Sequence, residues 1–343
     1  MAQKRNQEQD ITVESLGDGP GLREADIDSW HRVLLACAAV DESGEPAPER
    51  AQTAARLRHA PVGARVRYWV ARDEEGVVVG TAQLRLFEES GRSRLSRCRI
   101  AVHPERRRQG IGSELLAVVQ SGAREAGRTS LGCGNVTGTA APAALGAWGF
   151  SRGSEYLKLR LRVADCDQDA LRAVVRAASE GYHLARWQGI APADLAPAYA
   201  EARATMADAP SGGVDRGRVD WDAARVRELA ELHARRGEGL LTVAALYQDE
   251  HGEEAVAGFS EVILPGGTHA RQSDTAVARP HRGRGLGLWV KAAMLQWLLG
   301  AHPEVAEVIT VCAESNRHMI AINEQLGFEL VGREYEFTLA LTP

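Results

Sequence analysis

Lysine is rare in this sequence: it occurs only at Lys4, Lys158 and Lys291, so arginine supplies almost all of the positive charge. Long hydrophobic runs are missing as well. No segment approaches the ~20 apolar residues that a membrane-spanning helix needs, and the first residues lack the hydrophobic stretch of a signal peptide. We therefore expect a cytoplasmic protein with no membrane partner.

Cysteines are few and irregularly placed. The five of them form no C-x-x-C pair, which argues against a disulfide framework and against a zinc site. His103, His281 and His318 show no spacing that suggests metal ligands. We expect reduced thiols and no bound metal.

Charge and length limit the possible partners and the number of domains. The formal net charge is -5 and the pI is near 6.1, which gives no overall electrostatic reason to bind nucleic acid. Hydrophobic residues make up 44% and charged residues 25%, the balance of a soluble globular protein. A chain of 343 residues suits about two ordinary domains, each able to bury its own core.

An internal repeat supports two domains. Residues 100–113 (IAVHPERRRQGIGS) match residues 275–288 (TAVARPHRGRGLGL), about half the chain apart. The shared positions are Val102 with Val277, Arg107 with Arg282, Gly110 with Gly285 and Gly112 with Gly287. A second landmark follows in each half, WGF at 148–150 and LGF at 326–328. Matched landmarks in one register indicate a duplication.

Both halves also share an order of expected elements. Helices are predicted at 24–40, 49–57, 192–207 and 221–236, before β-rich hairpins at 66–87 and 240–264 with turn signals at 73–76 and 249–252. Further helices are expected at 112–126 and 287–299. The run 208–213 is expected to form a loop over the cleft of the second half. The sequence thus predicts an α+β fold, with a disordered tail at 1–10 and two domains, 11–165 and 166–343. Each domain is expected to hold a mixed, mostly antiparallel sheet flanked by helices.

The repeated motif is a strand, the pattern R-x-x-G-x-G and a helix. The first turn of a helix leaves backbone N–H groups unpaired and carries partial positive charge, so it attracts anions. Glycines let the backbone approach phosphate oxygens, and arginines add charge-assisted hydrogen bonds. The pattern is neither the nucleoside-triphosphate loop nor the dinucleotide fingerprint. One copy is as often an ordinary loop, and the run 106–108 alone suits a solvated surface, but two copies in one register favour a diphosphate site.

These residues resemble the GNAT superfamily of acyl-CoA-dependent N-acetyltransferases, in a tandem form. Residues 277–287 (VARPHRGRGLG) are similar to the family's acyl-CoA motif, and so are residues 102–112. Residues 316–328 (NRHMIAINEQLGF) are similar to its second landmark, an Asn, a helix that carries a Tyr and a closing Gly-Phe. The landmarks and their hairpins cover most of both halves. The resemblance implies acetyl-CoA as the acetyl donor.

The resemblance also implies which residues contact the cofactor. The strand that ends near Val277 would pair with the pantetheine arm, the following loop would hold the diphosphate, and Asn316 would contact the arm. The implied acetyl-CoA-binding residues are Val277, Ala278, Arg282, Gly283, Arg284, Gly285, Leu286, Gly287 and Asn316 in the second half, and Val102, Arg107, Arg108, Gly110, Ile111 and Gly112 in the first.

Acetyl transfer to an amine needs a neutral amine, an oxyanion donor and a proton for the departing thiolate. The resemblance implies that a backbone N–H of about Val277 or Ala278 is the oxyanion donor. Asp274 is predicted as the catalytic base or as an anchor for a cationic substrate, with Glu261 as a second candidate. The competing interpretation of either acid is an exposed strand residue or a turn partner. The aligned residue of the first half is Arg99, which cannot accept a proton at neutral pH.

The sequence departs from the family where a Tyr general acid is usual. That position is Asn323, a candidate catalytic residue that donates a hydrogen bond but releases no proton at useful pH. Water, Tyr335 or the unaided thiolate would then complete the reaction. The first half has Gly138 and Leu145 in place of the Asn and the Tyr. Its loop therefore either binds acyl-CoA unproductively or is structural.

The leading hypothesis is an N-acetyltransferase, monomeric or homodimeric, that acts on a small-molecule amine such as an antibiotic, an amino sugar or an amino-acid derivative. A narrower alternative is an enzyme similar to mycothiol synthases, which also resemble tandem members of the superfamily. An alternative of another class is a non-catalytic acyl-CoA sensor or interaction protein, which the missing Tyr and the degenerate first half favour.

Overall fold

A computed structural model describes residues 11–41, 47–138, 140–177, 180–208, 217–248 and 252–342. The tail expected at 1–10, most of the loop expected at 208–213 and residues 249–251 of the second turn lie outside the described residues. Among the described residues, no helix combines the length and the apolar character that crossing a membrane requires.

Contacts divide the chain into two compact units. Unit 1 comprises Met1–Arg152 together with Glu336–Pro343, and unit 2 comprises Gly153–Tyr335. These ranges differ from the expected domains 11–165 and 166–343 at both ends of the second half. The reason is strand pairing, because β6 (Ser151–Arg162) pairs antiparallel with β11 (Glu307–Ala313) of unit 2. The end of β12 (Glu329–Ala340) belongs to unit 1 instead.

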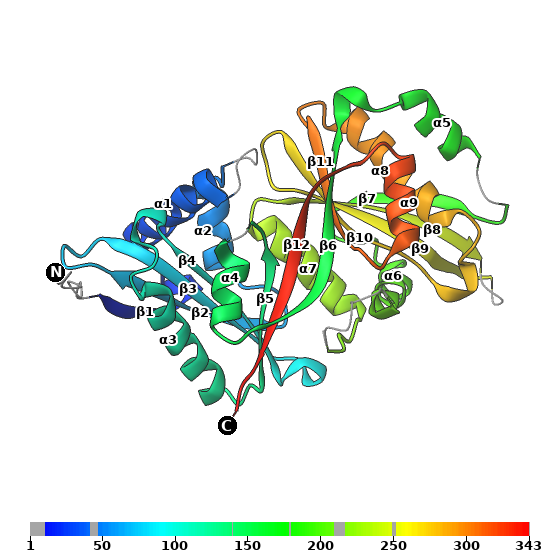
Figure 1. The fold of residues 1–343 in the computed structure, drawn as a ribbon. Helices are drawn as coiled ribbons and strands as arrows, with labels where there is room; N and C mark the ends of the chain where they lie inside the picture. Colours follow the sequence, from blue (N-terminus) through cyan, green and yellow to red (C-terminus); the bar gives the residue numbers. More distant parts are fainter. Residues whose placement is uncertain are drawn as a thin grey trace. The chain divides into compact units, whose positions relative to one another are not determined.

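Unit 1 follows the order of elements that the sequence predicts for its first half (Figure 1). Its elements are β1 (Thr12–Asp18), α1 (Glu24–Asp41), α2 (Arg50–Arg58), β2 (Ala64–Arg72), β3 (Val78–Phe87), β4 (Leu95–Val102), α3 (Ile111–Glu125), β5 (Ser130–Val136) and α4 (Ala140–Ala147). The strands lie in the order β1-β2-β3-β4-β5. The first four are antiparallel neighbours, and β4 pairs with β5 in parallel.

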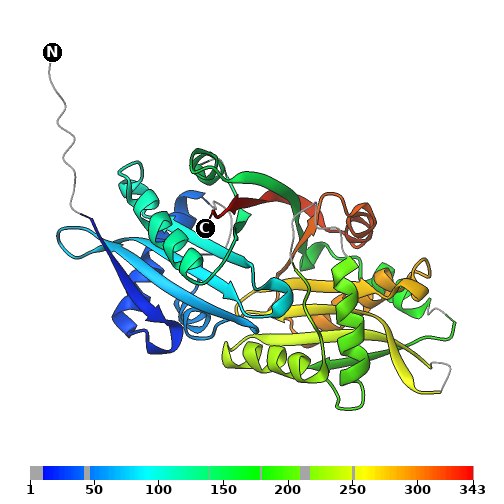
Figure 2. The ribbon, with the colours of Figure 1, turned by 90° about the horizontal axis from the view of Figure 1, so that it is seen from below.

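Helices cover both faces of the unit 1 sheet. Tyr68 packs in one cluster with residues of α1 and α2, and its hydroxyl donates to the Leu57 carbonyl at 3.0 Å. The neighbouring Trp69 lies close to Gly122 of α3 instead. Successive strand residues point to opposite faces, so α3 covers the face opposite α1 and α2, as Figure 2 shows.

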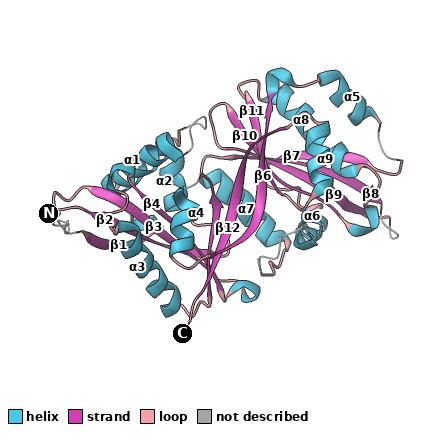
Figure 3. Ribbon diagram, in the orientation of Figure 1, coloured by secondary structure: helices cyan, strands magenta, loops and turns pink. Residues whose placement is uncertain are grey.

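Unit 2 repeats this order and adds a helix and a strand before it. Its elements after β6 are α5 (Gln168–Arg176), β7 (His183–Gln188), α6 (Ala196–Ala204), α7 (Ala223–Arg235), β8 (Gly239–Gln248), β9 (Glu254–Leu264), β10 (His269–Val277), α8 (Leu286–Ala301), β11, α9 (Arg317–Gln325) and β12. The strands lie in the order β7-β8-β9-β10-β11-β6, and the β10–β11 pair is parallel. Figure 3 distinguishes these strands from the helices by colour. The sequence did not predict α5, β7 or β1.

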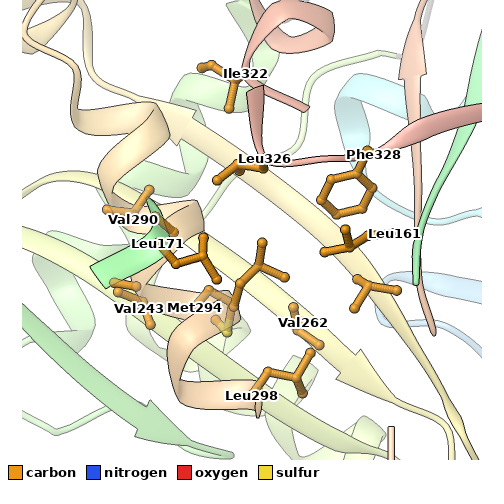
Figure 4. Packing of buried hydrophobic residues seen from close by; sticks show 14 of the residues in the cluster. Leu161, Leu171, Val243, Val262, Val290, Met294, Leu298, Ile322, Leu326 and Phe328 are labelled. Carbon is orange, nitrogen blue, oxygen red and sulfur yellow. The ribbon is translucent and has the colours of Figure 1, made fainter. Parts of the chain in front are cut away.

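The main core of unit 2 lies between the sheet and α8. Val243 and Val262 of the sheet pack with Val290 and Met294 of α8 and with Leu326 after α9 (Figure 4). A second cluster on the other face joins Ala244 and Phe259 to residues of α6 and α7. α8 and α9 therefore share one face, and α6 and α7 cover the other. The structure confirms an α+β fold of two tandem domains with mixed sheets.

Candidate active site

The glycine loop of unit 2 has an open backbone at two of its glycines. Gly283 and Gly285 both adopt the left-handed region with φ of 76°, which a glycine reaches without steric cost. A Cβ atom built on either residue would meet no atom of the described residues within 4 Å. No side chain of the described residues caps the first turn of α8. The loop thus presents unpaired helix N–H groups to an incoming anion.

Unit 1 repeats this loop conformation. Arg108 and Gly110 adopt φ of 65° and 86° at the places of Gly283 and Gly285. The arginine at the first of these positions is unusual, because only a few per cent of non-glycine residues have positive φ. The duplication seen in the sequence is therefore also a duplication of backbone geometry.

Arg282 and Arg107 hold the loops in place from within the protein. Arg282 donates from Nε to the Val277 carbonyl at 2.9 Å and from Nη2 to Asp208 at 3.1 Å. Arg107 donates from Nε to the Val102 carbonyl at 3.2 Å, and both of its Nη atoms donate to Asp41. The Asp41 carboxylate raises the pKa of Arg107. Both predicted phosphate ligands thus tie the loop to the preceding strand and to a nearby carboxylate.

The strand before each loop separates from its parallel neighbour. Among the described residues, β10 pairs with β11 only from His269 to Arg271, opposite Glu307 to Ile309. The rest of β10 stays paired with β9 on its other edge, out to Val277. Backbone groups of β10 beyond Arg271 therefore face the gap toward β11, where an extended ligand can supply the missing ladder partners.

A β-bulge distinguishes the two units at the predicted base. The register of β10 with β9 shifts between Gln272 and Thr275, so one extra residue lies in β10. Asp274 lies in this bulge, and bulges re-aim side chains. In unit 1 the β3–β4 register is continuous from Gly80 to Leu86, and Arg99 pairs regularly with Gln83.

Asp274 and Glu261 meet at one buried arginine that the sequence reasoning missed. Arg203 of α6 donates to Asp274 Oδ2 at 2.9 Å, to the Glu261 carboxylate and to the Tyr199 hydroxyl oxygen at 3.2 Å. Its guanidinium carbon lies 4.1 Å from the centre of the Trp221 ring. An alanine-rich helix gives no sequence signal for this role.

The two acids differ in exposure. Glu261 is 2% exposed, and the Tyr199 hydroxyl also donates to it. The side chain of Asp274 is 37% exposed. Burial and the Glu261 charge raise the pKa of Tyr199 well above its usual value, so this hydroxyl stays protonated as a donor. Glu261 is thus enclosed by its partners, whereas Asp274 faces solvent.

The second landmark brings Asn316 and Asn323 to the α8 face. Asn316 caps α9, and its Oδ1 accepts from the Met319 N–H at 3.2 Å. Asn323 is fully buried, with Nδ2 at 3.9 Å from the Cys312 sulfur. Its Oδ1 has no hydrogen-bond partner among the described residues. In unit 1, Gly138 replaces the capping Asn and has a φ of 67°.

Unit 1 also carries an aromatic side chain against its loop. The ring of Trp148 lies 2.9 Å from the position that a Cβ on Gly112 would take, and its Nε1 donates to Ser113 Oγ at 3.1 Å. The corresponding neighbour of Gly287 is the smaller Ile322. The first helical turn of unit 1 is therefore more crowded than that of unit 2.

Comparison with known families agrees with this geometry. Residues 64–147 match the family described as "Acetyltransferase (GNAT) domain", and residues 207–328 match "Acetyltransferase (GNAT) family". Together these matches span more than half of the chain. A search of curated proteins gave no significant match.

Solved structures with the same fold cover nearly the whole chain. A tandem GNAT protein from the clavulanic acid biosynthesis pathway, in a structure without acetyl-CoA, has 28% identity and a TM-score of 0.80 over 97% of this chain and 99% of that chain. A GCN5-related N-acetyltransferase from Sphaerobacter thermophilus has 14% identity and a TM-score of 0.68, with 97% and 96% covered. A glucosamine N-acetyltransferase region of a fungal multi-domain β-N-acetylglucosaminidase has 15% identity and a TM-score of 0.66, with 96% and 38% covered.

The fold, the paired glycine loops and the separated parallel strands define an acyltransferase. The chain belongs to the GNAT family of N-acetyltransferases and carries two of its domains in tandem.

Proposed function

We propose that unit 2 transfers an acetyl group from acetyl-CoA to the primary amine of a small molecule, such as an antibiotic, an amino sugar or an amino-acid derivative. One observation carries the proposal. The bulge in β10 places the partly exposed Asp274 at the gap between β10 and β11, on the strand that leads into the open glycine loop. Unit 1 has an arginine and no bulge at this place.

The residues of unit 2 fit acetyl-CoA. The N–H groups at Gly283, Gly285 and the first turn of α8 would hold the diphosphate, since this backbone is open and has no capping side chain among the described residues. The free edge of β10 would pair with the pantetheine arm. GNAT enzymes generally use this donor, and here it would supply the activated acetyl group.

Asp274 is the better candidate for the base. A base must reach the proton that it accepts, and the exposed side chain of Asp274 can approach an incoming ammonium group. Arg203 fixes its orientation through Oδ2 at 2.9 Å and leaves Oδ1 available to the amine. Glu261 is enclosed by Arg203 and Tyr199, so we assign it a structural role in holding Arg203. An N–H near Val277 remains the proposed oxyanion donor.

Unit 1 is proposed to act structurally. It lacks the bulge and both polar side chains of the second landmark, and Trp148 crowds its loop. A non-catalytic acyl-CoA sensor is the alternative, and the same assay separates it from an enzyme. Tight acetyl-CoA binding without thiol release for any amine would support the sensor.

Replacing Asp274 by Asn is expected to lower kcat about 100-fold, since the amide keeps the shape but accepts no proton. Thiol release from acetyl-CoA is measured with a panel of aminoglycosides, amino sugars and amino-acid amides, and calorimetry gives the Kd for acetyl-CoA, which should stay unchanged. The matched variant in unit 1 is Arg99→Gln, for which full turnover is expected. Normal turnover in Asp274→Asn together with loss in Arg107→Ala would instead place the chemistry in unit 1.

A further inference from the structure

One of the three lysines of the chain lies in the core of unit 2. Lys291 belongs to α8 and is 1% exposed. The sheet and α5 present apolar side chains to α8, among them those packed around Val290 and Met294 (Figure 4). Lys291 follows Val290 directly in this helix. An ammonium group in apolar surroundings is unfavourable unless it is paired. Packing alone therefore does not explain why a lysine lies in this core.

Among the described residues, no carboxylate forms an ion pair with Lys291 or raises its pKa. Its Nζ lies 5.4 Å from the centre of the Phe328 ring, a cation–π distance. The titratable group that faces it is the Cys312 thiol of β11. Among the described residues no hydrogen bond from Nζ is found. Burial lowers the pKa of Lys291 to about 7, while the Cys312 charge acts in the opposite direction.

Asn323 reaches the same thiol from α9. Its Nδ2 lies 3.9 Å from the Cys312 sulfur, and its buried Oδ1 has no partner among the described residues. Lys291 and Asn323 thus face one sulfur atom from two helices. Asn323 occupies the position where the family landmark carries its Tyr. The Lys291 amine therefore lies near the position at which this chain lacks the usual proton donor.

The cluster of Lys291, Cys312 and Asn323 lies on the face of the sheet that α8 covers. Cys312 lies three positions after Ile309, which is the last residue of β11 that pairs with β10. Its side chain packs in the core beside α8. Asp274 contacts Arg203 of α6 and therefore faces the opposite side of the sheet. The Lys291 cluster and Asp274 thus lie on opposite faces of the sheet, beside the strands between which the thioester would pass.

We propose that Lys291 donates the proton to the coenzyme A thiolate that leaves after acetyl transfer, in place of the Tyr that position 323 lacks. This inference rests on the proposed acetyl transfer in unit 2. When the tetrahedral adduct collapses, its carbon–sulfur bond breaks and the electron pair passes to sulfur. A proton moves from the Nζ ammonium to that sulfur, which yields the free thiol and a neutral amine. Solvent then returns a proton to Nζ.

The kinetic test compares wild type with Lys291→Met, a substitution of similar length without charge. Loss of a general acid is expected to reduce kcat about 10- to 100-fold, while the Kd for acetyl-CoA changes less than about threefold. In wild type, kcat should fall as the pH rises above the pKa of Lys291, and this limb should be missing in the variant. Adding Asn323→Tyr to Lys291→Met should recover part of kcat. An unchanged kcat, or a loss that Asn323→Tyr does not relieve, would refute a proton-donor role.

A second measurement does not depend on turnover. Because the chain has only three lysines, a sample with ¹³C-labelled lysine gives few ε-carbon signals, and Lys291→Met identifies the one from Lys291. Its titration is followed without ligand, with CoA and with desulfo-CoA. Contact with the sulfur is expected to move the pKa by about half a pH unit or more with CoA only. Equal titration with CoA and desulfo-CoA overturns the inference, whereas absence of turnover with a CoA-specific shift overturns only the acetyl-transfer proposal.

Folding of Lys291→Met is checked by thermal unfolding. The lysine has a lower pKa when folded, about 7, than when unfolded, about 10.4. Below pH 7 the Lys291 side chain is charged in both the folded and the unfolded protein, so burial of the charge lowers the stability by its full amount. Between pH 7 and about 10 this loss of stability declines. The variant should therefore melt at a higher temperature than wild type at pH 6, and the difference should shrink toward pH 10. A variant that melts lower at pH 6 would indicate that the ammonium is stabilised by its surroundings, against the proposed availability of its proton.

Discussion

Gly285→Asp is expected to lower the affinity of unit 2 for acetyl-CoA at least roughly 1,000-fold, because like charges in contact cost several kcal/mol. Gly285 precedes α8 with a φ of 76°, and a Cβ atom there would meet no described residue within 4 Å. Aspartate tolerates the left-handed region better than most residues and is a good helix cap, so the fold should persist. Its carboxylate would, however, occupy the position proposed for the diphosphate.

Two matched variants separate the causes of this loss. Gly285→Asn has the same shape without the charge, and we expect a loss of about tenfold from the occupied space and the capped N–H. Gly110→Asp makes the same change in unit 1. Calorimetry reports the Kd and the number of acetyl-CoA molecules bound. Wild-type affinity in Gly285→Asp, with affinity lost in Gly110→Asp, would move the cofactor site to unit 1.

Arg203→Met is expected to reduce the free energy of unfolding by about 3–5 kcal/mol, because removal of one partner leaves an uncompensated buried charge. Glu261 is 2% exposed and would lose the guanidinium that balances it. Asp274 would lose its 2.9 Å contact as well, but it reaches solvent. Denaturation by guanidinium chloride, with unchanged m-value, measures the loss.

The double variant Arg203→Met with Glu261→Gln tests the cause. A neutral amide removes the uncompensated charge, so most of the lost stability should return. Arg279→Met provides the comparison for an exposed ion pair: Arg279 binds Asp208 at 2.8 Å, but its side chain is 73% exposed. Its loss should leave the midpoint of denaturation almost unchanged, because solvent screens an exposed ion pair. If Arg203→Met and Arg279→Met lowered the free energy of unfolding equally, burial of the Arg203 ion pair would not be the cause of the loss.

Local patterns were sufficient for the repeated elements. The hairpin predicted at 66–87 appears as β2 and β3, and the helices predicted at 112–126 and 287–299 appear as α3 and α8. Glycines, and apolar residues that recur at helical spacing after them, can be recognised within a short stretch of sequence. The family was also accessible, because its landmarks are local motifs. The catalytic roles of Asp274 and Asn323 stay predictions, and so does the structural role that we propose for Glu261.

Other features of the site have weak signals or none. Arg203 lies in an alanine-rich helix, which carries no signal for an ion pair. Its partner Glu261 lies on a strand 58 positions further along the chain, so only folding brings the two together. Lys291 did leave a trace, as a single charged residue in the apolar helix LGLWVKAAMLQWLLGA. Its neighbours Cys312 and Asn323 could not be recognised from that trace.

The sequence by itself determined the duplication, the α+β elements, the two glycine loops and membership of the GNAT family, because each depends on residues close together along the chain. Only the tertiary structure decided that β6 pairs in unit 2 while the end of β12 belongs to unit 1. It alone also showed the bulge at Asp274, the buried Arg203 and the position of Lys291 beside Cys312. The physical reason is that strand pairing and charge burial join residues distant in sequence, and an alternating pattern specifies a face of a sheet but not a neighbour.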